Sequence, residues 1–179
     1  MLIENDKKKI IGLMNDLFCG MYFNGYQFSS SFTLNFERED LKQNLPLNME
    51  LYLEKWWFGE KEEWESRLFK LKDQKAQNIE ESLQSFDLTS MRWSEGAEIY
   101  HISLNDETLQ IKFKNGHQLN ISCIPIMGPN WMLIGTPSHD VNPRGRLWST
   151  NEKDWAFTCE NGEYFARIPE QIQDREDNT

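Results

Sequence analysis

The sequence predicts an α+β protein in which N-terminal helices pack on one face of an antiparallel, meander-type sheet. Over residues 1–90 apolar residues mainly recur at helical spacing, whereas over 91–170 they mainly alternate with polar residues, as in strands with one buried face. The 179 residues, 39% of them hydrophobic, suffice for one domain with a sizeable core. We therefore expect a single α+β domain over residues 1–179, with a charged tail at 171–179.

The first predicted helix follows three lysines near the N-terminus. Apolar residues recur at helical spacing over Ile10–Met21. Either Asn5 or Asp6 can cap the start of this helix, and Gly20 can end it. The next stretch, Ser31–Glu37, alternates apolar and polar residues and predicts a half-buried strand.

Two later segments allow more than one interpretation. Met49–Trp57 alternates like a strand, but a polar residue before it could also cap a helix. Over Glu60–Phe86 the helical period returns, and it fits either one long helix or two shorter helices that meet near Asp73. Trp64 and Phe86 lie on apolar stripes of this region, which we expect to cover the sheet.

Turn positions in the second half can be deduced because the apolar residues of paired strands must share one face. The loop Asn105–Thr108 satisfies this condition for the first hairpin. A two-residue turn at Asn115-Gly116 would mix the faces of the next hairpin, so we expect a three-residue loop over 114–116 with Gly116 in the left-handed conformation. The expected cross-strand pairs are Leu104 with Leu109, Ile102 with Ile111, Ile111 with Leu119, and Leu109 with Ile121.

A third hairpin is predicted near the C-terminus. Asn161-Gly162 suits a tight two-residue turn between two alternating segments. This turn sets three pairs on one apolar face: Cys159 with Tyr164, Phe157 with Ala166, and Trp155 with Ile168. We therefore expect Trp155 to be a core residue.

Charge and targeting signals exclude several classes of protein. The formal net charge is -10 and the sequence pI is about 4.8, which argues against binding to nucleic acid or to an anionic membrane. The apolar stretch after the N-terminal lysines is interrupted at Asn15-Asp16, unlike that of a secretory signal. The three cysteines are widely spaced, as expected for free thiols in a reducing compartment. A cytoplasmic location is therefore expected.

A metal centre is not predicted. Zinc ligands could come from His101, Cys123 and Cys159, but these residues form no pair with ligand spacing and fall on different predicted strands. Cys159 lies on an apolar face, where a small buried thiol is common. The sequence also contains no phosphate-binding glycine loop and no dinucleotide fingerprint, so we expect no cofactor.

A polar loop over Thr136–Arg146 is the main candidate for an enzyme or small-molecule site. Long polar loops in compact domains are often functional. A base and an anion clamp are both available there, but neighbours in sequence do not by themselves form a catalytic triad. The residues of this alternative site are His139, Asp140, Arg144, Arg146 and Trp148.

Acidic clusters and adjacent tryptophans form the main candidate for a partner-binding site. Trp56 and Trp57 cannot both point to the same side of a strand or helix, so one of them can be exposed as an anchor beside carboxylates. An aromatic anchor ringed by carboxylates suits a basic protein partner. The predicted partner-binding residues are Glu37, Glu39, Asp40, Trp56, Trp57, Glu60, Glu62 and Glu63.

This small, acidic, Trp-rich α+β chain without an enzyme signature resembles the immunity proteins of bacterial contact-dependent and polymorphic toxin systems. Its stretches Ile99–Leu104 and Leu109–Ile121 are similar to the sheet patterns of several such families. The resemblance implies an inhibitor that binds a cognate toxin domain, such as a nuclease, and covers its active site with an acidic surface. The alternatives are the enzyme or small-molecule site in the polar loop, and an adaptor that self-associates through an apolar patch.

Overall fold

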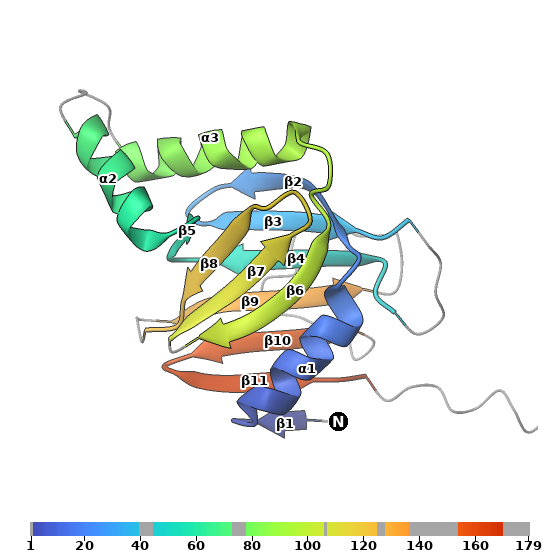
Figure 1. Cartoon of the computed structure of the whole chain (residues 1–179). Coiled ribbons are helices and arrows are strands. Elements are labelled where there is room, and N and C mark those ends of the chain that lie inside the picture. Colours follow the sequence, from blue (N-terminus) through green and yellow to red (C-terminus); the bar gives the residue numbers. More distant parts are fainter. Residues whose placement is uncertain are drawn as a thin grey trace, which may run out of the picture.

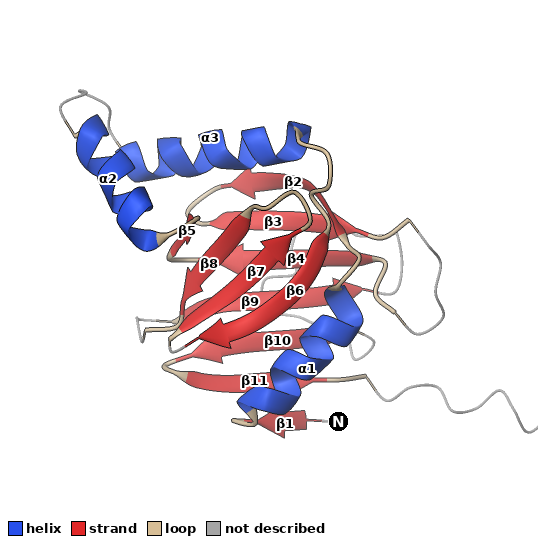
Figure 2. Cartoon of the chain, viewed as in Figure 1, coloured by secondary structure: helices blue, strands red, loops and turns tan. Residues whose placement is uncertain are grey.

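Two antiparallel sheets packed face to face dominate the computed structural model (Figure 1). It describes residues 2–39, 45–72, 78–105, 107–124, 128–136 and 154–169. Within these residues there are three helices, two at the margin of the sheets and one across the face of the large sheet beside the small sheet (Figure 2). They are α1 (Lys7–Phe18), α2 (Lys61–Leu71) and α3 (Ile79–Trp93).

The larger sheet has seven strands in the order β1-β11-β10-β9-β4-β3-β2, and the smaller has four in the order β5-β8-β7-β6. Neighbouring strands in both sheets run antiparallel. The strands are β1 (Leu2–Glu4), β2 (Tyr22–Phe28), β3 (Phe32–Glu37), β4 (Asn48–Leu53), β5 (Trp56–Phe58), β6 (Ile99–Asn105), β7 (Thr108–Phe113), β8 (Gln118–Ser122), β9 (Pro129–Thr136), β10 (Trp155–Glu160) and β11 (Glu163–Arg167).

The α+β class is confirmed, but the prediction of one sheet covered by N-terminal helices is wrong. The second layer over the large sheet is mainly another sheet, and five strands come from the first 58 residues. The ambiguous stretch Met49–Trp57 supplies β4 and β5, so its strand interpretation is correct. The large sheet is not a simple meander because β4 pairs with β9, some 80 residues further along the chain.

Aromatic side chains fill the space between the two sheets. Phe36 of β3 stacks on Phe113 of β7 with ring centroids 6.2 Å apart and an interplanar angle of 6°. Phe32 of β3 meets the edge of Trp56 of β5 at 5.1 Å and 84°. All four side chains are buried. Such pairs add a directional contribution of about 0.5–1.5 kcal/mol each to the burial of large apolar areas, so they fix how the sheets stack.

Helix α1 lies against the small sheet and contacts its edge strand β6. Asp6 caps the helix by accepting from the Lys9 N–H at 3.0 Å, as one of the two sequence alternatives predicted. The amide of Asn15 donates to the Ile102 carbonyl at 2.6 Å and accepts from the Ile102 N–H at 2.9 Å. One side chain thus occupies part of the β6 edge as a neighbouring strand would.

The guanidinium of Arg38 caps the C-terminal end of α1. It is buried and donates to the carbonyls of Leu17 at 2.8 Å and Cys19 at 3.1 Å. Because the last carbonyls of a helix lack partners within the helix, this contact both satisfies them and joins the helix to the end of β3. Gly20 follows with φ 88°, as expected for the predicted end of the helix.

The predicted turns are confirmed where the structure describes them. Gly116 has φ 87°, and the Asn161-Gly162 turn has φ values of 53° and 78°. In the Glu60–Phe86 region the chain forms two helices, and the second extends to Trp93, beyond the predicted limit. The observed cross-strand pairs include Leu104–Leu109, Ile102–Ile111, Ile111–Leu119, Leu109–Ile121, Cys159–Tyr164 and Phe157–Ala166.

Two glycines test the packing of this core in opposite directions. A Cβ added at Gly135 of β9 would lie 2.9 Å from Pro46 Cβ and 3.0 Å from Phe18 Cε1, so Gly135→Ala should destabilise the protein by about 1–3 kcal/mol. A Cβ at Gly12, inside α1, would meet nothing within 4 Å. Gly12→Ala should therefore stabilise the protein by roughly 0.5–1 kcal/mol. Urea unfolding of the two variants measures both effects, and equal stabilities would contradict the packing.

Candidate functional site

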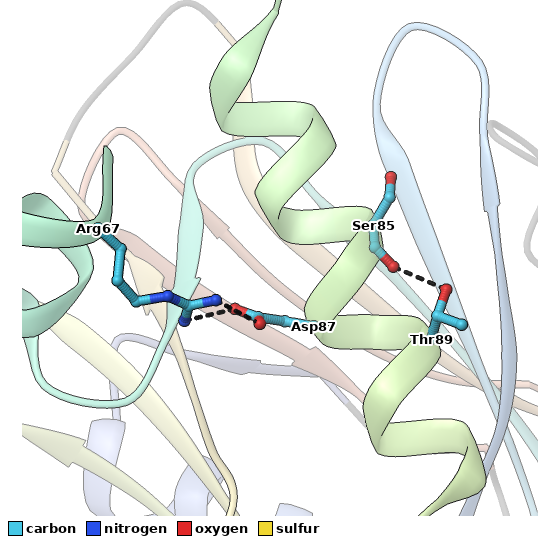
Figure 3. Close-up of polar contacts among 4 residues, drawn as sticks. All are labelled: Arg67, Ser85, Asp87 and Thr89. Carbon is cyan, nitrogen blue, oxygen red and sulfur yellow. Dashed lines mark hydrogen bonds and ion pairs between the residues drawn. The ribbon is translucent and has the colours of Figure 1, made fainter. Parts of the chain in front are cut away.

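Helices α2 and α3 form a hairpin, and an ion pair joins them in the part of the chain that the structure describes. Arg67 of α2 donates two hydrogen bonds to the Asp87 carboxylate of α3, at 2.9 and 2.6 Å (Figure 3). The hydrogen bond to Asp87 raises the pKa of Arg67 above its ordinary value. The same guanidinium lies 5.6 Å from the centroid of the buried Trp64 ring. The two parallel hydrogen bonds join the helices, and the ring of Trp64, on the same helix as Arg67, holds the guanidinium in place.

Helix α3 is also tied to both sheets. Gln84 is buried and donates to the Trp56 carbonyl of β5 at 2.9 Å. The Tyr26 hydroxyl of β2 contacts the Ser85 carbonyl at 3.4 Å and the Thr89 hydroxyl at 3.3 Å. Thr89 in turn donates to Ser85 at 2.8 Å (Figure 3). Gln84 and the buried helical residues hold one face of α3 inward, whereas Tyr26 contacts the helix from the side of Ser85 and Thr89.

The opposite face of α3 exposes two large aromatic side chains. Phe86 is 67% exposed and Trp93 is 83% exposed. They lie seven residues apart, so they project from one side of the helix with a spacing of about 10 Å along its axis. We call this pair the α3 outer stripe. Exposed aromatics at this spacing on a firmly held helix are suited to contact with another protein.

The apolar stripe predicted that the Phe86 side chain points inward toward the sheet, and this prediction is wrong. The buried positions of α3 are Leu83, Gln84, Asp87, Leu88 and Met91. On a helical wheel these positions centre on the side opposite Phe86 and Trp93. The buried face contains two polar residues, Gln84 and Asp87. A prediction based only on the spacing of apolar residues therefore placed the buried face on a different side of the helix.

The two adjacent tryptophans at the start of this region have different environments. Trp56 is only 1% exposed and packs between the sheets, so it is a core residue and its predicted role as a partner contact is wrong. Trp57 is half-buried, and the Lys61 ammonium lies 5.9 Å from its ring centroid. Both residues belong to β5, where successive side chains point to opposite faces. Trp57 is the one that can reach a partner.

The predicted acidic residues do not form one continuous surface. Glu37 and Glu39 are exposed at the end of β3, where Glu37 accepts from the Asn24 amide at 2.9 Å. Glu60, Glu62 and Glu63 are exposed around the start of α2. Strand β4, six residues or about 20 Å long, separates the two groups (Figure 1). Asp40 lies outside the described residues.

Local charges at the helix hairpin are more balanced than the whole chain suggests. Residues 60–72 carry four acidic and four basic side chains, so that segment is neutral. Residues 78–93 carry three acidic side chains and one basic side chain, a net charge of -2. Glu62 and Glu63 lie in the first turn of α2, and Glu80 and Glu81 in the first turn of α3. Carboxylates in the first turn of a helix interact favourably with the helix dipole, and they would also attract a basic partner.

The alternative loop site is placed only at its first residue. Thr136 ends β9 and is buried. The remaining loop residues lie outside the described part of the chain, and this applies to all the predicted site residues: His139, Asp140, Arg144, Arg146 and Trp148.

The structure brings together two residues that sequence spacing kept apart. Cys123 and Cys159 are both buried, and their side chains are close enough for a hydrogen bond to form between the two thiols. His101 is exposed on β6. No cluster of three or more metal-ligating His, Cys, Asp or Glu side chains occurs among the described residues. The adjacency of the two cysteines arises from long-range strand pairing, for which the sequence carries no local signal.

Comparisons with protein-family models, with curated proteins and with solved structures give no match. None of the three helices in the described part of the chain has the length and apolar character needed to cross a membrane. The candidate site therefore rests on the contacts and exposures of the helix hairpin.

The ion pair between the helices predicts a measurable coupling energy. Arg67→Ala and Asp87→Ala should each destabilise the protein, and the double variant should lose less than the sum of the two single losses. The expected difference is about 1 kcal/mol, because the pair is bidentate but the Arg67 side chain stays 33% exposed. Denaturant unfolding of the four proteins gives the coupling, and additive losses would contradict a role for this pair in helix orientation.

Proposed function

We propose that this protein is a bacterial immunity protein, which binds a cognate toxin domain in the cytoplasm and occludes its active site. The observation that carries the proposal is the α3 outer stripe: Phe86 and Trp93 are exposed on a helix whose buried face is fixed by Gln84 and Asp87. A rigid helix presenting two aromatic anchors needs little reordering when it binds a partner.

The charge of the chain suits a basic partner. At a net charge of -10 the whole surface attracts a cationic domain, such as a nuclease with a phosphate-binding cleft. The carboxylates of Glu60, Glu62 and Glu63 lie near Trp57 in the sequence and are exposed. In this proposal they steer the toxin domain toward the inhibitor, whereas the α3 outer stripe supplies most of the short-range contact.

A growth competition tests immunity and does not require the toxin to be identified. A strain of the source organism that lacks this chain should be outcompeted by its parent when the cells are in contact, because the parent still delivers the toxin. A plasmid copy of the natural chain should restore survival. A Trp93→Ser/Phe86→Ser copy should fail to restore it, since loss of two aromatic anchors costs about 2 kcal/mol or more each at an interface.

The matched control is Phe69→Ser, which removes an aromatic side chain that is 71% exposed on α2, away from the α3 outer stripe. This control copy should restore survival, and all copies should accumulate to equal levels. If the deletion strain and its parent were equally fit in this competition, the immunity proposal would be contradicted. Full rescue by the double variant would keep immunity but exclude the α3 outer stripe as its surface.

A second experiment separates steering from contact. Charge reversal of Glu60, Glu62 and Glu63 to lysine should slow association with the captured toxin domain by roughly tenfold at low salt and flatten the dependence of that rate on salt. Dissociation should change little. Stopped-flow or surface-based kinetics at two ionic strengths give both rates.

The control for this experiment is reversal of Glu37 and Glu39, at the far end of β4. If reversal at the far end slows association equally, net charge alone accounts for steering. If neither reversal changes the rate, the acidic residues lie outside the path of approach.

A further inference from the structure

A second feature of the molecule, unrelated to the helix hairpin, is a cluster of polar and thiol groups inside the core. It consists of Cys123, just after β8, Asn130 and Trp131 of β9, Cys159 of β10, and Tyr164 of β11, and we call it the thiol cluster. All five side chains are buried. The cluster lies where the end of the small sheet meets three strands of the large sheet.

A β-bulge aims two consecutive residues of β9 into this cluster. Cys159 pairs with Trp131 but the next residue, Glu160, pairs with Pro129, so Asn130 is an extra residue on β9. In a regular strand, consecutive side chains would point to opposite faces, whereas a bulge turns an additional side chain to the same side. Asn130 and Trp131 are accordingly both buried and both contact sulfur.

The two sulfur atoms are held by neighbouring residues. The Trp131 indole donates to Cys123 Sγ at 3.3 Å, and Cys159 Sγ donates to Asn130 Oδ1 at 3.9 Å. Asn130 is fixed in turn, because its amide donates to the Ile124 carbonyl at 2.5 Å. The Tyr164 ring lies 6.3 Å from the Trp131 ring. Both sulfurs therefore converge on one pair of adjacent residues, and neither thiol points into a purely apolar space.

Proton affinities differ strongly within the thiol cluster. Hydrogen bonds from Cys159, Tyr164 and Trp131 lower the pKa of Cys123 to about 6 despite its burial. The hydrogen bond to Cys123, together with burial, raises the pKa of Cys159. The pKa of Cys123 is thus lowered and that of Cys159 raised, which are the directions that suit a nucleophile and a resolving thiol.

We propose that Cys123 and Cys159 are a dithiol site that a peroxide converts to a disulfide between the two sheets. In the first step the Cys123 thiolate attacks one peroxide oxygen, the O–O bond breaks, and the sulfur becomes a sulfenic acid while hydroxide leaves. In the second step the Cys159 sulfur attacks the sulfenic sulfur and expels a second hydroxide.

The reaction balances in atoms and electrons. The two sulfurs lose two electrons and form one S–S bond, and the peroxide gains them. The two hydroxide ions become two water molecules, using the proton of the Cys159 thiol and the proton that Cys123 gave up on ionisation. A cellular thiol reductant reverses the bond by exchange.

The test uses the unaltered 179-residue chain with hydrogen peroxide under native conditions. After oxidation, the remaining thiols are alkylated, the chain is digested without reductant, and cross-linked peptides are identified by mass spectrometry. We expect the Cys123–Cys159 cross-link to predominate over any pair that includes Cys19, which is partly exposed. The same chain oxidised in denaturant should give a mixture of all three pairings, because the fold no longer selects one.

Cross-links of Cys19 with either buried cysteine in the native chain, or separate oxidation of Cys123 and Cys159 to sulfinic acids, would overturn the proposal. Cys19→Ser supplies a second measurement that leaves the core intact. Its oxidised form should melt roughly 5–10 °C above its reduced form, since the bond closes a long loop, and a reductant should abolish the difference. Equal melting temperatures for a chain shown to be cross-linked would reject a lock between the sheets.

Discussion

The fold depends on the burial of two apolar sheet faces against each other. The stacked rings of Phe36 and Phe113 and the edge contact of Phe32 with Trp56 lie in that interface, and each pair joins one strand of the large sheet to one strand of the small sheet. Because the sheets cover one another, α2 and α3 are left at the margin, and α1 lies beside the small sheet over β10 and β11 of the large sheet (Figure 1). Their polar contacts then serve to close edges and ends, as Asn15 does at β6 and Arg38 does at the end of α1.

Because the two sheets bury each other's apolar faces, α3 can expose aromatic side chains to solvent. A helix that covered a sheet would have to turn its largest apolar residues inward. Helix α3 is instead held by polar contacts of Gln84 and Asp87, and its buried apolar residues, Leu83, Leu88 and Met91, are smaller than Phe86 and Trp93. Phe86 and Trp93 then lie outside the core, and the proposed binding role would account for large apolar side chains at exposed positions.

Local geometry explains which parts of the fold the sequence could predict. Hairpin registers such as Leu104–Leu109 and Cys159–Tyr164 follow from the two-residue period and the turn residues, and both were correct. The pairing of β4 with β9 joins segments far apart in the chain and has no local signature. The candidate site shows the same limit: Trp57 was within reach of sequence reasoning, but the exposure of Trp93 depended on polar residues that fill the inner face of α3.

The thiol cluster shows how a long-range pairing can change the chemistry of residues that look inert in the sequence. Cys159 on an apolar face looks like a small hydrophobic residue. Only the bulge at Asn130 gives Cys159 an amide acceptor, and only the end of β8 places near it a second sulfur, that of Cys123, which accepts from the Trp131 indole. The cluster joins the two sheets at the strands and shares no residue with the α3 outer stripe, so oxidation there would act on the rigidity of the sheet layers and leave the aromatic anchors unchanged. If the protein is the immunity protein proposed above, it would keep its binding surface while its core becomes harder to unfold.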